Sequence, residues 1–188
     1  FYPYLRPGAA TYLCGSGASP PTSLAGNPRS PRYRPPNAVI PSFHHPPTPV
    51  NHVATPAAVA PIDRPGAEWY KSLGRGEQAG TKVISLSGDV VRPGNYEVPL
   101  GFPLLELIQW AGGVPEGRSI QAVTMAGLSG GFLAGDDMDV TLDEPSIRAK
   151  GSFLGAGGIM VFDDSRDMIE VSHQAMEFFA HESCGKCF

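Results

Sequence analysis

Two cysteines near the end of the sequence, Cys184 and Cys187, have a spacing that suits metal or redox chemistry. A C-x-x-C pair supplies two thiolates that one centre can share, whereas a cubane iron–sulfur cluster takes four such ligands. The pair therefore indicates half of a cluster ligand set. On spacing alone, a redox dithiol, half of a zinc site or two thiols without a function remain open. The third cysteine, Cys14, stands alone and is expected to pack as a small apolar residue.

The segment before this pair must position it, and its pattern is helical. Redox dithiols usually stand at the start of a helix that follows a strand, so a position after a long helix favours a ligand role. Because the sequence begins at Phe1 and ends one residue after Cys187, we expect an internal segment of a longer redox protein. Apolar residues at helical spacings predict one buried helix face before the cysteines: Met168, Ile169, Ala175, Met176, Phe178 and Phe179.

Composition narrows the class of protein. The chain has 188 residues, which suits one large or two small domains. Its net charge of -4 gives no reason to expect a nucleic-acid partner. No apolar run reaches the roughly 18 residues that cross a bilayer, so we expect no direct membrane insertion. Three cysteines do not make a secreted disulfide framework, which favours a reducing, cytoplasmic location.

The first third of the chain differs from the rest in charge and in proline content. Residues 1–62 contain four arginines and no acid, so all 18 acids follow them. Of the 20 prolines, 15 lie within residues 1–65, so this stretch is expected to carry little regular helix. A disordered basic linker is one interpretation. Two less proline-rich segments, residues 8–15 and 50–55, stand against it.

Residues 80–163 have the pattern of a small globular α+β domain. A strand over residues 82–88, a Pro-Gly turn at residues 92–95 and a returning strand at residues 96–98 predict a hairpin. A helix is expected to start at residues 101–103, with Pro103 in its first turn, and to end at Gly112-Gly113. Weaker strands are expected near residues 122–125, 138–142 and 158–162. A helix packed across a hairpin, with further strands, indicates a β-grasp arrangement.

Two segments resemble a known family closely enough to name it. The run Ser87-Gly88-Asp89-Val90-Val91-Arg92-Pro93-Gly94-Asn95-Tyr96-Glu97-Val98-Pro99 resembles the β-grasp (SLBB) module. The run Glu177-Phe178-Phe179-Ala180-His181-Glu182-Ser183-Cys184-Gly185-Lys186-Cys187 resembles the cluster-binding helix of the NADH-oxidising flavoproteins. That family includes the NADH-binding (51 kDa) subunit of respiratory complex I. It also includes the diaphorase subunits of NAD-dependent formate dehydrogenases and NAD-reducing hydrogenases.

The resemblance also covers the proline-rich part. Residues 12–15 are similar to the family's Tyr-Ile-Cys-Gly segment, residues 31–36 to its Pro-Arg-x-Lys-Pro-Pro segment, and residues 50–55 to its Val-Asn-Asn-Val-Glu-Thr segment. By resemblance, Cys184 and Cys187 are ligands of a 4Fe-4S cluster. The flavin mononucleotide (FMN) site is implied at five positions, namely Tyr12, Gly15, Val50, Asn51 and Thr55.

The family implies a domain order and a function. Residues 1–75 would be the C-terminal part of an α/β FMN- and NADH-binding domain, residues 80–163 an SLBB domain, and residues 165–188 the start of a helical 4Fe-4S domain. NADH would pass a hydride to FMN, and single electrons would then pass to the cluster. Partners would be the other subunits of a respiratory or NAD-linked dehydrogenase complex, which could hold the chain at the inner face of the membrane.

Departures from the family pattern support a second hypothesis. Ser16-Gly17 stands where the family has Glu-Glu. Pro20-Pro21 falls where the family continues a helix, and because an interior proline costs a helix about 3 kcal/mol, that helix is not expected to form in the family's way. The alternative is therefore a redox-inactive structural or binding module that retains the β-grasp fold. The sequence leaves open whether FMN binds, whether the complex handles quinone, formate or hydrogen, and whether the β-grasp domain has a ligand.

Overall fold

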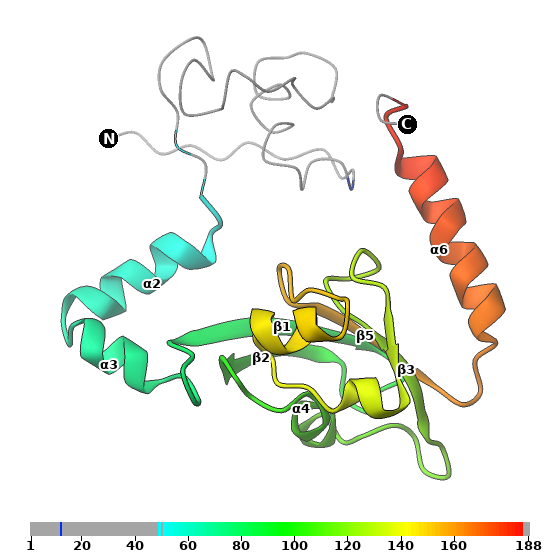
Figure 1. Ribbon diagram of the computed structural model, residues 1–188, viewed down its shortest axis with the longest axis horizontal. Helices are drawn as coiled ribbons and strands as arrows, with labels where there is room; N and C mark the ends of the chain where they lie inside the picture. Colours follow the sequence, from blue (N-terminus) through cyan, green and yellow to red (C-terminus); the bar gives the residue numbers. More distant parts are fainter. Residues whose placement is uncertain (1–11, 13–48, 50, 186–188) are drawn as a thin grey trace. The chain divides into compact units, whose positions relative to one another are not determined.

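The computed structural model describes Tyr12, Pro49 and residues 51–185 (Figure 1). Contacts divide the chain into two compact units, one of Ala58–Val171 and one of Phe1–Ala57 with Ser172–Phe188. The predictions for Gly15, Val50 and Cys187 lie outside the described residues, as do those for Cys14 and residues 16–37. Within the described part of the chain, no helix has the length and apolar character needed to cross a membrane.

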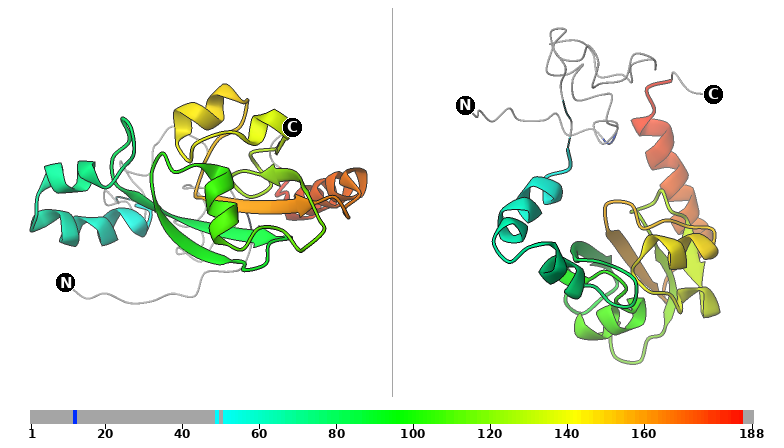
Figure 2. Two further views of the ribbon diagram at one scale, coloured as in Figure 1. Left: turned by 90° about the horizontal axis from the view of Figure 1, so that it is seen from below. Right: turned by 60° about the vertical axis from the view of Figure 1, so that its left-hand side comes forward.

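The first of these units is built on a five-stranded mixed sheet. Its strands are β1 (Thr81–Gly88), β2 (Gly94–Pro99), β3 (Ile120–Thr124), β4 (Phe132–Ala134) and β5 (Gly158–Asp163), in the order β2-β1-β5-β3-β4. β1 and β5 pair in parallel, whereas the other neighbours are antiparallel. Figure 2 shows the sheet from below, with helix α4 (Leu104–Trp110) against it. The expected α+β fold is confirmed.

The core lies between one face of this sheet and helices α4 and α5 (Glu144–Ala149). In β1, Ile84 and Leu86 are buried while the alternate side chains are exposed, as a sheet with one covered face requires. From α4, Leu104, Leu107 and Ile108 enter the same core. Burying a side chain of this size stabilises the fold by about 1.5–3 kcal/mol. Among the residues that the structure describes, the buried apolar side chains all lie in this unit, between Ile84 and Phe162.

The predicted hairpin and helix are confirmed in position. β1 and β2 pair from Thr81↔Pro99 to Leu86↔Gly94. The Tyr96 hydroxyl donates to the Arg92 carbonyl at 2.6 Å and closes the connection between them. Pro103 is the residue before α4 rather than a member of its first turn. At the other end, the Gly113 amide donates to the Ile108 carbonyl at 2.9 Å, so the helix stops where the Gly-Gly pair predicts.

One predicted strand is wrong, and several elements were not predicted. Residues 135–138 form a 3₁₀ helix, and of the expected strand at residues 138–142 only a bridge between Pro103 and Thr141 is present. Residues 138–142 alternate buried and more exposed side chains as a strand does, but they lack the ladder of pairs that defines one. The short strand β4 was not predicted. Nor was α5, although Asp143 caps it by accepting the Ser146 amide at 2.8 Å.

Helix α2 (Ala54–Asp63) is a ten-residue helix within the stretch that was expected to carry little regular helix, and helix α3 (Ala67–Ser72) follows that stretch. Pro56 is the third residue of α2, where a helix needs no amide donor. Pro61 lies inside α2 and removes one helical hydrogen bond. Alanines supply the helix propensity that offsets this loss.

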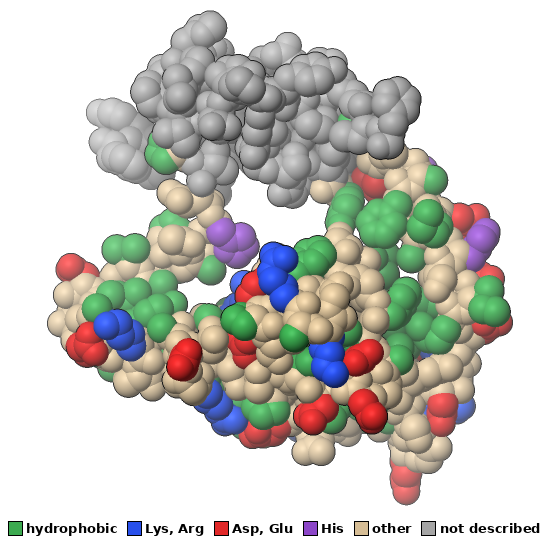
Figure 3. All heavy atoms as spheres, in the orientation of Figure 1, with side chains coloured by type: hydrophobic (Ala, Val, Ile, Leu, Met, Phe, Trp, Pro, Cys, Tyr) green, Lys and Arg blue, Asp and Glu red, His purple; other side chains and the backbone are tan. Residues whose placement is uncertain are grey.

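Helix α6 (Met168–Glu182) confirms the predicted helix but not its buried face. None of its residues is buried, and Ile169 is 81% exposed and Met176 67%. Figure 3 shows hydrophobic side chains along this helix beside acidic and histidine side chains. The helical spacing of apolar residues indicated the helix correctly, because spacing reflects backbone geometry. The spacing does not indicate whether other residues of this chain cover the apolar side chains of α6.

Candidate functional site

Cys184 lies just beyond the end of α6, in a turn that its neighbours define. The Ser183 hydroxyl accepts a hydrogen bond from the Gly185 amide at 3.1 Å, and Gly185 has a φ of 70°, which favours glycine. The Cys184 side chain is half-buried and carries a free thiol. A partly exposed thiol in a defined turn is suited to metal ligation or to redox chemistry.

Tyr12 contacts the last turns of α6, close to this cysteine. Its backbone amide donates to Oε2 of Glu182 at 3.0 Å, across 170 positions of sequence. Its ring centroid lies 5.2 Å from that of Phe178, edge-on, and 5.9 Å from that of Phe179. Edge-on and tilted rings at these separations attract one another. The structure thus brings a predicted FMN residue to the helix that leads into a predicted cluster ligand.

Asn51 and Thr55 lie at the start of α2. The Thr55 amide donates to the His52 carbonyl at 3.0 Å, and Nδ1 of His52 accepts the Ala54 amide at 3.2 Å. Both Asn51 and Thr55 are exposed. An amide and a hydroxyl side chain beside the first turn of a helix are donors suited to an anionic ligand such as a phosphate.

The described residues do not form a complete metal site. Among them, no group of three or more His, Cys, Asp or Glu side chains is placed to hold an ion. Cys184 is the one predicted metal ligand among these residues, since Cys187 lies outside them. Among the described residues, the end of α6 therefore supplies one thiol to any such site.

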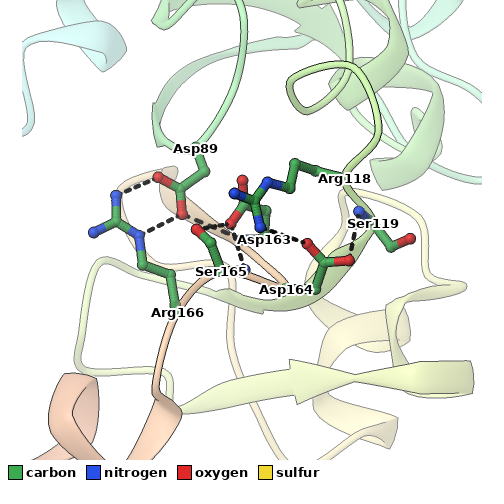
Figure 4. Close-up of polar contacts among 7 residues, drawn as sticks. All are labelled: Asp89, Arg118, Ser119, Asp163, Asp164, Ser165 and Arg166. Atoms are coloured by element: carbon green, nitrogen blue, oxygen red, sulfur yellow. Dashed lines mark hydrogen bonds and ion pairs between the residues drawn. The ribbon is translucent and has the colours of Figure 1, made fainter.

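At the other end of α6, a polar network joins the helix to the sheet (Figure 4). Asp89 follows β1, and Arg166 lies between β5 and α6. The Arg166 guanidinium donates to both carboxylate oxygens of Asp89, from Nε to Oδ2 at 2.8 Å and from Nη2 to Oδ1. Oδ2 also accepts the Asp163 amide at 3.2 Å. This two-bonded geometry is the strong form of an arginine–carboxylate pair.

The other residues between β5 and α6 are held in the same way. Oδ1 of Asp163 accepts the Ser165 amide at 2.9 Å. The Asp164 carboxylate accepts the Ser119 amide at 3.3 Å and lies 3.6 Å from the Arg118 guanidinium. Asp167 caps α6, since its Oδ1 accepts the Ile169 amide at 2.9 Å. The Ser165 hydroxyl donates to the same oxygen of Asp163 at 2.5 Å, so each residue of the connection has a side-chain hydrogen bond or ion pair.

The Asp89–Arg166 pair makes stability depend on pH. The hydrogen bond from Arg166 lowers the pKa of Asp89 from its ordinary value of 3.8, with further lowering by the Asp163 amide and the Arg118 charge and some opposition from burial. A carboxyl whose pKa is lower in the folded state contributes stability above its unfolded pKa, and that contribution is lost as the pH falls through the folded value.

We therefore expect Asp89→Asn to lower the free energy of unfolding by about 1–3 kcal/mol at neutral pH. The difference from the unsubstituted protein should stay constant from pH 8 to about pH 5 and shrink below about pH 4. Urea unfolding of both proteins at stepped pH measures it. A difference that persists unchanged at pH 3 would contradict the assignment.

Sequence reasoning missed this network. In the sequence, Asp89 is only one residue of the β-grasp run, and no pattern marks Arg166. The pair spans 77 positions, and neither helical nor strand periodicity connects such distant residues. The acid-rich run at residues 163–167, placed directly before a predicted helix, was the available signal, because acids are common at helix starts.

Comparison with known proteins identifies the class of domain. Residues 83–137 match the SLBB domain family. These residues run from β1 into the 3₁₀ helix, and they include the hairpin and α4. The chain therefore contains an SLBB domain.

The wider match identifies the family. The chain is 38% identical over 188 residues to the F 2 subunit of the NADH-quinone oxidoreductase of Rhizobium meliloti (strain 1021), covering 100% of this chain and 45% of that protein. It is 37% identical over 184 residues to the HndC subunit of the NADP-reducing hydrogenase of Solidesulfovibrio fructosivorans, covering 97% of this chain and 38% of that protein.

A solved structure agrees with this. The crystal structure of an NAD+-reducing [NiFe]-hydrogenase in the air-oxidized state matches 96% of this chain and 31% of that chain, with a TM-score of 0.84 and 37% identity. The chain belongs to the family of the NADH-quinone oxidoreductase F subunits and the related hydrogenase subunits. It spans less than half the length of these relatives.

Proposed function

We propose that these residues form part of an NADH-oxidising subunit that transfers electrons through a flavin to an iron–sulfur cluster. The relatives named above are subunits of an NADH-quinone oxidoreductase and of an NADP-reducing hydrogenase, which supports an oxidoreductase role. The observation that carries the proposal is the contact of Tyr12 with Glu182 and Phe178, because it joins the expected flavin segment to the helix of the expected cluster ligand.

The residues that would hold the two groups follow from their donor chemistry. Cys184 and Cys187 would supply two of the four thiolates of a 4Fe-4S cluster. Tyr12, Gly15, Val50, Asn51 and Thr55 would line the FMN site. FMN would accept a hydride from NADH and the cluster would accept single electrons.

The chain's own contribution is positioning. Tyr12 packs its ring against Phe178 and Phe179, and its backbone amide donates to Glu182. These contacts hold Tyr12, one of the residues proposed for FMN, against the last turns of α6. The Ser183–Gly185 hydrogen bond holds the backbone on both sides of Cys184. A ligand whose backbone is fixed in this way loses little conformational entropy when it binds a metal centre.

The test is to purify the full-length protein anaerobically and to measure flavin, iron, acid-labile sulfide and NADH–ferricyanide turnover. We expect one flavin and one cluster associated with this region, and NADH-dependent bleaching of the flavin. A full-length protein that binds neither flavin nor NADH would instead support the redox-inactive module, since the SLBB fold needs neither.

The 188 residues alone are expected to behave differently. Two thiolates do not complete a cubane, and the five positions proposed for FMN are only part of a flavin site. We therefore predict a folded SLBB domain without NADH–ferricyanide turnover. A rate above that of free flavin, measured on the purified 188-residue protein, would contradict this prediction.

A further inference from the structure

We propose that Val91, Arg92 and Trp110 form a docking surface, called here the Trp110 patch, for an acidic segment of a partner subunit. The partner segment would carry at least one carboxylate beside apolar side chains. The proposal rests on the proposed function only in treating this chain as part of a subunit, because a subunit has other subunits as neighbours. All three residues lie within the single compact unit Ala58–Val171.

The Trp110 patch exposes large apolar side chains at the end of α4. Trp110 is 50% exposed, and Val91, in the connection between β1 and β2, is 55% exposed. One part of the indole ring packs on the protein, since its centroid lies 4.5 Å from that of the buried Phe102 ring. Tryptophan is highly buried on average, and tryptophan and arginine are among the residues that contribute most to protein interfaces.

Backbone hydrogen bonds hold the patch in shape. The Val91 amide donates to the Gly113 carbonyl at 2.9 Å, and the Arg92 amide donates to the Ala111 carbonyl at 2.8 Å. The Arg92 carbonyl in turn accepts the Tyr96 hydroxyl at 2.6 Å. The β1–β2 connection is therefore fixed along the end of α4. A surface that is fixed before binding loses little conformational entropy when a partner binds.

Arg92 supplies a positive charge that the described part of the chain does not neutralise. Its Nη2 donates to the Trp110 carbonyl, which is uncharged, and no carboxylate of the described residues forms an ion pair with it. The other arginines of residues 67–171 each pair with a carboxylate: Arg75 with Glu106, Arg118 with Asp164, Arg148 with Glu144, and Arg166 with Asp89. A guanidinium that keeps unused N–H donors in a fixed fork matches a carboxylate, so the patch selects an acidic partner.

A second copy of the chain and a membrane surface fit the patch less well. Two-fold pairing of the patch with itself would bring two Arg92 charges toward each other. Anionic membranes attract clusters of about 4–8 basic residues, whereas the patch has one arginine and the chain has a net charge of -4. An acidic segment of a different protein satisfies both the charge and the apolar surface.

The first experiment places the photoreactive residue p-benzoylphenylalanine at position 91 of the full-length protein, purified within its assembly. The same residue at position 132 is the matched control, because Phe132 is 39% exposed in β4, at the opposite edge of the sheet from β2. We expect irradiation to join position 91, and not position 132, to a segment of another subunit that contains Asp or Glu. Mass spectrometry of the digested product identifies that segment.

The second experiment measures the Kd of the full-length protein for the subunit so identified. Trp110→Ala should weaken binding about thirtyfold, and Arg92→Glu at least tenfold, because like charges then meet. Phe132→Ala and Arg148→Glu make the same kinds of change at exposed positions outside the patch and should leave the Kd unchanged. Replacing the crosslinked carboxylate of the partner by arginine should restore binding of the Arg92→Glu variant, which misfolding of that variant would not allow.

Several results would overturn the proposal. A crosslink from position 91 to a second copy, to lipid or to another part of the same chain would assign the patch to that contact instead. No crosslink, or an unchanged Kd for Arg92→Glu, would show that no acidic segment binds there. Flavin content and NADH–ferricyanide turnover test the proposed function separately. A full-length protein without either would refute that function and leave a crosslink at position 91 in force.

Discussion

Replacing Cys184 by serine is expected to remove the cluster signal from the full-length protein while leaving the flavin in place. A hydroxyl is a hard, weakly acidic ligand and replaces a thiolate poorly on iron. Because loss of an outer partner already costs a metal site about 10–100-fold in affinity, loss of a direct ligand should lower cluster content at least tenfold. Iron and sulfide assays with EPR of the reduced protein measure this.

NADH–ferricyanide turnover separates the two sites in the same variant. The residues proposed for FMN do not include Cys184, so flavin reduction by NADH should persist when the cluster is lost. Cys14→Ser is the matched control, since it removes a thiol for which we propose no ligand role. A Cys184→Ser protein with a normal cluster signal would exclude Cys184 as a ligand.

The elements that sequence reasoning placed correctly are those whose local chemistry is sufficient. Strands β1 and β2 alternate buried and exposed residues on either side of a Pro-Gly turn. Helix α4 combines apolar residues at helical spacing with a Gly-Gly stop. In each case the period, the turn and the end signal agree, and such agreement specifies a local structure before any tertiary contact forms.

The errors at β4 and at residues 138–142 concern pairing with partners distant in sequence. β4 has three residues and exists because β3 pairs with it, for example Val123 with Leu133. Val140 and Leu142 are buried as a strand would bury them, but the Leu142 amide bonds to the Phe102 carbonyl in a single bridge rather than a ladder. The apolar pattern indicates which of these side chains are buried. Whether the backbone forms a ladder or a single bridge depends on the segments that lie beside it in the fold.

At the candidate site, too, the sequence predicts the local features and not the contacts between distant residues. The spacing of Cys184 and Cys187 suggested ligand chemistry, and the apolar period before them predicted α6. Neither pattern could place Tyr12 at Phe178 or Asp89 at Arg166, because each contact joins residues more than 70 positions apart. Resemblance to the family related Tyr12 to the flavin. The Asp89–Arg166 pair was visible only in the folded chain.

Gly88 is the position in the SLBB domain where a single methyl group is expected to do the most damage. Its φ of 86° is unfavourable for any residue with a side chain. An added Cβ would lie 2.1 Å from the carbonyl oxygen of Val161 and 2.8 Å from its amide nitrogen, and both are backbone atoms of the central strand β5. Backbone atoms paired in a sheet cannot rotate away, so the parallel β1–β5 pair would have to separate locally.

Gly88→Ala is therefore expected to lower the free energy of unfolding by about 2–5 kcal/mol, the combined cost of the backbone conformation and of overpacking. Urea unfolding followed by circular dichroism and by the fluorescence of Trp110 measures it. Gly94→Ala is the matched control in the neighbouring strand, because its added Cβ would meet nothing closer than the Tyr96 ring at 3.9 Å, and its stability should stay within about 0.5 kcal/mol. Equal midpoints for the two variants would show that β1 and β5 do not approach as closely as described. Since Asp89 follows Gly88 directly, the same substitution should also speed hydrogen exchange at residues 164–171, which would link the closest contact in the sheet to the connection before α6.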